Sequence, residues 1–302
     1  MATPNQINAE AGPPMNVRSA DTGAGRVRVT ALLPFFLITF GIAWGIFALY
    51  IYRTEQVVAI FGELTGRHPL FILAVWAPAI AACIVIASTT GADGLRRYLR
   101  RVLLWRCPGG WYIFLLVGVP LIFVAGSLLK GNISEWEFPF DSLSTLVIAL
   151  LLTLVTGPVE EFGWRGVALP LLQRKFAPIW ASLILGTIWG AWHLPAFMLS
   201  GTPQSAWEFT PFLIGSITLS VIVTPMFNAS RGSILLPALF HAQLNNPIWP
   251  DAQPFDTYVL VVVALAVVLI HRKAMFSRTG AATQVAPPDA PAASPTKESP
   301  TH

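Results

Sequence analysis

Residues 69–89 read PLFILAVWAPAIAACIVIAST, a stretch without a single charged side chain. An α-helix of about 20 apolar residues is long enough to cross the hydrocarbon core of a bilayer, so this stretch predicts a membrane-spanning helix. Of the 302 residues in the chain, 54% are hydrophobic and 11% are charged, and the mean hydropathy is +0.63. Soluble domains carry about 25% charged residues. The composition therefore excludes a soluble globular protein.

Further apolar runs predict an all-α, polytopic membrane protein with about eight transmembrane helices. The other expected spans cover residues 31–52, 111–129, 142–163, 179–199, 209–228, 233–248 and 256–271, and polar residues interrupt the fourth and seventh spans. We expect one membrane domain over residues 30–273. The flanking segments, 1–29 and the Pro- and Ala-rich 274–302, are predicted to be disordered because they cannot bury enough apolar surface to offset chain entropy.

Charge in the loops predicts the orientation, because Lys and Arg are retained on the cytoplasmic side. The loop after the second expected span carries five arginines, whereas the loop after the third carries Lys130 against Glu135, Glu137 and Asp141. We therefore expect both termini in the cytoplasm, with the chain in the cell membrane. This asymmetry accounts for the net charge of +4 without a nucleic-acid partner.

Ionisable residues inside a span are costly and point to a functional site. In GPVEEFGWRG, residues 157–166, Glu161 and Arg165 are four apart and share one helix face, so they are expected to form an ion pair. Glu160 points about 100° away and needs a partner from another helix. A purely structural alternative joins all three residues in one ionic cluster.

Two histidines and an asparagine complete the polar set within the spans. His193 follows Trp189 by four residues in WGAWHLPAF, and His241 and Asn245 share one helix face in FHAQLNN. Two neutral donors side by side are suited to stabilise an oxyanion. Together with a carboxylate, they predict hydrolysis of an acyl bond by general-base activation of water.

The expected depths of these residues in the membrane do not agree. Counted from the cytoplasmic ends, His193 and His241 lie well inside their spans, whereas Glu160 lies near the inner end of residues 142–163. Either the fourth span continues towards Arg174 with a bend near Gly157-Pro158, or the fifth span begins later than residue 179.

The three motifs in their order resemble a known family. EEFGWR at 160–165 fits EExxxR, the segment ending at His193 fits an aromatic-xxxH motif, and residues 241–245 fit HxxxN. They are similar to the motifs of the CAAX protease and bacteriocin-processing (CPBP, or abortive-infection) family of intramembrane glutamic endopeptidases, which has an eight-helix fold. RGSILLPALFHAQLNN, from Arg231, also resembles the family's approach to its third motif. Trp189 stands where the family usually has Phe, a change expected to affect pocket shape more than chemistry.

The resemblance implies a role for each matching residue. Glu160 and His193 would activate water, His241 and Asn245 would hold the oxyanion, and Glu161 with Arg165 would support the site. It also implies no metal or cofactor, and a protein or peptide substrate that is membrane-associated or lipidated. The sequence does not identify that substrate.

Other functions remain open at this point. Glu160, His193 and His241 could instead form a three-ligand zinc site with an open position for water. The same fold could also serve as a non-catalytic membrane scaffold or immunity protein. A transporter is disfavoured because the sequence has no paired broken helices or half-chain symmetry.

Overall fold

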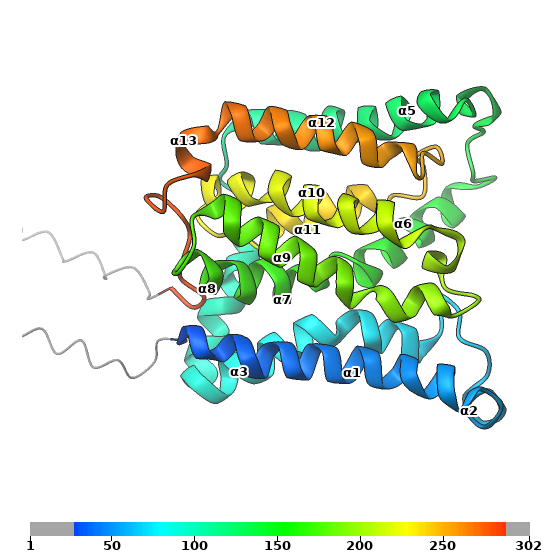
Figure 1. Cartoon of the computed structure of the whole chain (residues 1–302), viewed down its shortest axis with the longest axis horizontal. Helices are drawn as coiled ribbons and strands as arrows, with labels where there is room; N and C mark the ends of the chain where they lie inside the picture. Colours follow the sequence, from blue (N-terminus) through cyan, green and yellow to red (C-terminus); the bar gives the residue numbers. More distant parts are fainter. Residues whose placement is uncertain (1–26, 288–302) are drawn as a thin grey trace, which may run out of the picture.

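In the computed structural model, which describes residues 27–287, the chain forms a bundle of helices, and that range contains no strand (Figure 1). The α-helices are α1 (Leu32–Tyr52), α2 (Thr54–Phe61), α3 (Pro69–Leu99), α4 (Gly109–Ile113), α5 (Val119–Lys130), α6 (Leu143–Thr156), α7 (Glu160–Gly163), α8 (Leu169–Gln173), α9 (Pro178–Trp192), α10 (Phe209–Ala229), α11 (Leu235–Leu244), α12 (Phe255–Ile270) and α13 (Arg272–Met275). Short 3-10 segments are Val29–Ala31, Arg100–Leu103, Ile133–Glu135, Leu194–Met198 and Pro203–Ala206, and π-helical turns are Phe114–Gly118 and Trp164–Ala168.

The predicted all-α membrane architecture is confirmed. Six helical segments in the described range are long and apolar enough to cross a membrane: Val29–Tyr52, Pro69–Leu103, Gly109–Lys130, Leu143–Gln173, Pro178–Met198 and Phe209–Ala229. Two shorter apolar helices, α11 and α12, occupy the places of the seventh and eighth expected spans. The chain is therefore a multi-pass membrane protein.

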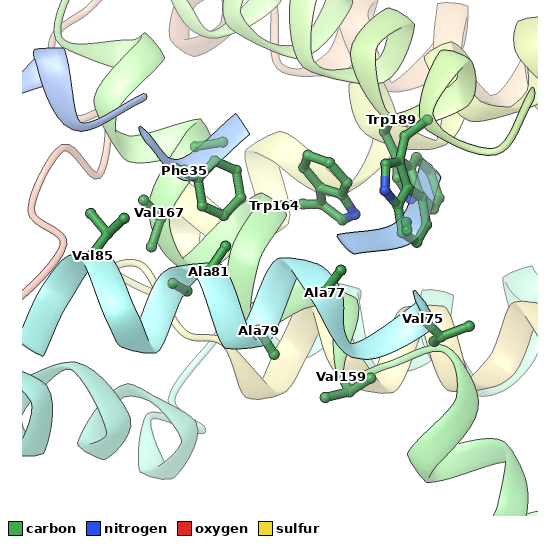
Figure 2. Close-up of a cluster of buried hydrophobic side chains, with 14 of the residues drawn as sticks. Phe35, Val75, Ala77, Ala79, Ala81, Val85, Val159, Trp164, Val167 and Trp189 are labelled. Carbon is green, nitrogen blue, oxygen red and sulfur yellow. The ribbon is translucent and has the colours of Figure 1, made fainter. Parts of the chain in front are cut away.

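Small side chains let the helices of the core approach closely. On α3, Ala74, Ala77, Ala81 and Ala82 are fully buried. A Cβ atom at Gly163 would lie 2.6 Å from the carbonyl oxygen of Pro78, so only glycine permits this approach of α7 to α3. Membrane helices use such positions because lipid offers no hydrophobic drive for their association. Figure 2 shows the alanines of α3 beneath Phe35, Val167 and Trp164.

The fourth spanning segment is longer than expected and is broken in the middle. It runs from Leu143 to Gln173, and Gly157 leaves the helical conformation with φ −146° and ψ −58° directly before Pro158. Proline cannot supply a backbone N–H and disfavours helical geometry in the residue before it. Of the two explanations for the disagreement in depth, the bent and longer fourth span is the correct one. Glu160 therefore lies in the middle of that segment.

The two ends of the bundle differ in their charged residues. We define the basic end by residues Arg28, Arg96, Arg97, Arg100, Arg101, Arg106, Arg174, Lys175, Arg231, Arg272, Lys273 and Arg278. The described range starts and stops at this end (Figure 1). We define the acidic end, at the opposite side near α2, by residues Glu55, Glu63, Glu135, Glu137, Asp141, Glu208 and Asp251, which outnumber the cations Arg53, Arg67 and Lys130 there.

The basic end is held together by arginines that bind backbone carbonyls. Arg101 is buried, and its guanidinium donates to the carbonyl oxygens of Gly232 (2.8 Å), Gly166 (2.6 Å) and Val285 (3.0 Å). Arg174 donates to the carbonyl oxygen of Thr283 at 2.8 Å. These bonds join parts of the chain that are far apart in sequence.

Residues 277–287 differ from the expectation of a disordered tail. Val285 is 1% exposed, and Gln173 donates to the carbonyl oxygen of Ala282 at 2.9 Å. The composition of this segment does not reveal its few apolar contacts, nor the arginines elsewhere in the chain that bind its backbone. Most of the expected N-terminal segment, and residues 288–302 of the expected tail, lie outside the described residues. The domain boundaries stay predictions.

Candidate active site

Glu160 begins α7, directly after the break in the fourth spanning segment, and is 3% exposed. Its Oε2 accepts hydrogen bonds from the indole Nε1 of Trp189 at 2.8 Å and of Trp164 at 3.3 Å. Within the described range, its Oε1 has no hydrogen-bond partner, and Glu160 lines a cavity. The partner from another helix that the sequence required is thus Trp189 of α9. One carboxylate oxygen is held while the other is free.

Glu161 faces away from Glu160, as the helix geometry predicted. Its Oε1 accepts from Arg165 at 2.9 Å and from Nδ1 of His241 at 2.8 Å, and all three residues are buried. The expected Glu161–Arg165 pair is therefore present and extends to α11. The alternative in which Glu160 joins the same ionic cluster is not what forms, because the hydrogen bonds to Glu160 come from indoles.

The bond to Glu161 also fixes what His241 can do. A carboxylate only accepts, so Nδ1 of His241 is the donor in this bond. Nε2 can then donate to an oxyanion only when the imidazole carries both protons. The expected oxyanion role of His241 stays a prediction, and Nε2 is the ring nitrogen left for it.

His193 caps the end of α9 and is oriented by its own helix. Its Nδ1 lies 2.8 Å from the carbonyl oxygen of Trp189, so Nδ1 carries the proton. Its Nε2 then has a free lone pair in the neutral ring. The ring packs edge-on against Trp192, with centroids 4.8 Å apart, and against Phe212 at 4.9 Å. His193 is thus placed as an acceptor, in contrast to His241.

Asn245 directly follows α11 and lies beside Gly157, at the break in the fourth spanning segment. A Cβ atom at Gly157 would collide with Nδ2 of Asn245 and would lie 3.0 Å from Nε2 of His241. Both nitrogen donors therefore converge on the same backbone position. Only glycine leaves room for them there.

One cavity of about 460 Å³ brings these groups together. Glu160, His193, His241 and Asn245 all line it, whereas Glu161 and Arg165 are not among its lining residues. The ring of Trp189 lies between the two histidines, with centroids 5.8 Å from His193 and 5.6 Å from His241. The structure thus separates the four residues expected to touch substrate from the two expected to support them.

The zinc alternative is not supported by this arrangement. Within residues 27–287, no group of three or more His, Cys, Asp or Glu side chains lies close enough together to hold a metal ion.

Sequence reasoning missed the two indole donors. Trp164 and Trp189 lie next to one another above α3 (Figure 2) and both bind Oε2 of Glu160. The spacing of Trp164 four residues after Glu160 was a usable signal. Because Trp189 donates a hydrogen bond that Phe could not, its departure from the expected motif bears on chemistry as well as on pocket shape.

Known proteins share this pattern. A family model described as type II CAAX prenyl endopeptidase Rce1-like matches residues 142–246, a range that contains all three motifs. CAAX prenyl protease 2 of Methanococcus maripaludis is 27% identical over 270 residues, which cover 82% of this chain and 96% of that protein. The segment that carries the three motifs thus matches the CAAX prenyl endopeptidase family. The protein is a peptidase, and its substrate is a protein or a peptide.

Proposed function

We propose that this membrane endopeptidase is an intramembrane glutamic peptidase that cleaves its substrate without a metal ion. The observation that carries this proposal is the single cavity lined by Glu160, His193, His241 and Asn245, in which Glu160 keeps one oxygen free. The cavity supplies a general base, an acceptor and two donors, which is a sufficient set for acyl hydrolysis.

In the proposed reaction, a water molecule lies between Glu160 and His193. Oε1 of Glu160 takes one proton from the water, and Nε2 of His193 accepts a hydrogen bond from its other hydrogen. The hydroxide attacks the carbonyl carbon of the scissile bond. Glu160 then returns the proton to the leaving amine, so the products are a carboxylate and an amine.

The charge that develops on the carbonyl oxygen is stabilised by His241 and Asn245 in this proposal. Nδ2 of Asn245 and Nε2 of protonated His241 would both donate to it. Glu161 orients His241 through their hydrogen bond, and Arg165 pairs with Glu161. This assigns Glu161 and Arg165 positioning roles.

We also propose the setting of the reaction. The protein lies in the cell membrane with its basic end on the cytoplasmic side, as the positive-inside rule indicates. Both chain termini are then cytoplasmic. The substrate is a membrane-associated polypeptide, and a lipid group on it would contribute to its binding.

The test is cleavage of matched lipidated and unlipidated peptides by the purified, detergent-solubilised protein. It compares wild type, Glu160→Gln and wild type with a strong chelator. Cleavage that survives the chelator and is lost in the variant is the expected result. Loss of cleavage with the chelator would overturn the metal-independent mechanism. An inactive but folded wild type would favour the scaffold alternative.

A further inference from the structure

Asp256 is a second carboxylate in the cavity, and neither the motifs nor the proposed reaction uses it. It lies in the first turn of α12 and is 7% exposed. Its Oδ1 accepts from the backbone N–H of Thr257 at 2.9 Å. Its side chain makes no ion pair within residues 27–287. Asp256 lines the same cavity as Glu160.

The position of Asp256 is fixed by close packing of two helices. A Cβ atom at Gly126 of α5 would lie 2.9 Å from the backbone nitrogen of Asp256 and 2.8 Å from Cβ of Ala252. Lys130, on the same helix as Gly126, does not neutralise Asp256, because it is bonded to Asp251 at 2.6 Å. The carboxylate is therefore held rigidly and lacks a cation of its own.

Apart from its two histidines, the cavity is lined by ionisable side chains of one kind, carboxylates. It contains two carboxylates, Glu160 and Asp256, and no Lys or Arg. Aromatic rings line it as well, among them Phe47, Phe71 and Trp207. Buried carboxylates and aromatic faces both attract cations in a desolvated site.

The cavity also extends to the acidic end of the molecule. Its lining runs from Glu160 to Gly66, Pro203 and Gln204, which belong to loops at the acidic end. These loops contact one another, since a Cβ atom at Gly66 would lie 3.4 Å from the ring of Pro203. Carboxylates around a cleft raise the local concentration of positively charged ligands.

We propose that Asp256 is a specificity residue that binds a positively charged group of the substrate, a Lys or Arg side chain near the scissile bond, in a polypeptide that enters from the acidic end. This inference rests on the proposed function, since it names the substrate class of the same site. A purely structural role for Asp256 is the competing explanation, because a carboxylate in the first turn of a helix also interacts favourably with the helix dipole.

The test measures binding and is separate from cleavage. The full chain carries Glu160→Gln, which consumes no peptide and leaves Asp256 as the one carboxylate in the lining. Two short peptides with blocked termini differ only in a central Lys or norleucine, which share the same aliphatic stem. Their affinities are measured by fluorescence anisotropy in detergent, at low and high salt.

The Lys peptide is expected to bind about tenfold more tightly, and the ratio is expected to fall to about one after adding Asp256→Asn. The substitution retains the size of the side chain and its hydrogen bond from Thr257, so the fold is kept. Glu55→Gln is the matched control at the acidic end, at an exposed position outside the lining, and should preserve the preference. The preference should also weaken at high salt.

Equal affinity for the two peptides would overturn the inference, as would a preference that persists in Asp256→Asn. Failure of the proposed function has a different signature. Wild type would then cleave neither peptide, while the preference for Lys would still appear in the binding measurement.

Discussion

Charged side chains have different roles at the basic end and in the cavity. At the basic end, Arg101 makes three hydrogen bonds to backbone carbonyls and joins segments that are distant in sequence. In the cavity, Glu160 and Asp256 each have one carboxylate oxygen without a hydrogen bond in the described structure. Bonded charges stabilise the fold, whereas incompletely bonded charges are available to a ligand. Substitutions in the two regions should therefore affect stability and activity separately.

Among variants that keep Glu160, the largest expected effect is that of His193→Ala in the cavity. Loss of the acceptor that orients the attacking water should lower kcat about a thousandfold, within the range of general acid–base catalysis. The measurement is peptide cleavage per folded molecule. His271→Ala is the matched control at the basic end, where His271 stacks on Trp111. Similar losses of activity in both variants would contradict the division between the two regions.

Asn245→Ala removes one of the two donors to the oxyanion. We expect kcat to fall about a hundredfold, the usual cost of losing one such donor, with little change in KM. Steady-state kinetics separate the two parameters. Asn228→Ala serves as the control, since Asn228 binds Gln173 and Ala282 at the basic end. An increase in KM with unchanged kcat would show that Asn245 binds substrate rather than the transition state.

Arg101→Ala, at the basic end, should lower stability and leave activity unchanged, the opposite of the cavity variants. It leaves three buried carbonyls without their donor, and we expect the free energy of unfolding to fall by about 3 kcal/mol. Thermal unfolding in detergent checks this prediction. Activity per folded molecule should stay near the wild-type value, and Arg96→Ala, at an exposed position, should leave stability unchanged. A stable but inactive Arg101→Ala would mean that the basic end takes part in catalysis.

Trp189→Phe is expected to have a smaller effect on the reaction than the substitutions of His193 and Asn245. It retains the aromatic ring between the histidines and removes the 2.8 Å bond to Glu160. One hydrogen bond to a charged group contributes about 1.5 kcal/mol, so activity should change about tenfold. Trp164→Phe removes a longer bond, 3.3 Å, and should have less effect. A larger loss of activity in Trp164→Phe than in Trp189→Phe would show that Trp164 makes the more important hydrogen bond to Glu160.

Much of the fold could be predicted because membrane helices are recognisable in a sequence from their length and apolar composition. The Glu161–Arg165 pair was equally accessible, since residues four apart on a helix share a face regardless of the rest of the chain. The bend of the fourth span was foreseen as one alternative from Gly157-Pro158.

Contacts between helices were out of reach of the sequence. The bond from Trp189 to Glu160 and the bond from His241 to Glu161 depend on how α7, α9 and α11 pack. Periodicity within each helix carries no information about that packing. The same reason applies to Val285, whose carbonyl oxygen accepts a hydrogen bond from the distant Arg101.

Cleavage of one peptide substrate by purified Glu160→Gln, compared with wild type in the same detergent, tests the central claim most directly. Gln has the shape of Glu and can still accept the bonds from the two indoles, but it cannot take a proton from water. The account predicts an unchanged thermal midpoint and a loss of cleavage of about a thousandfold or more. Cleavage close to the wild-type rate by the folded variant would contradict it.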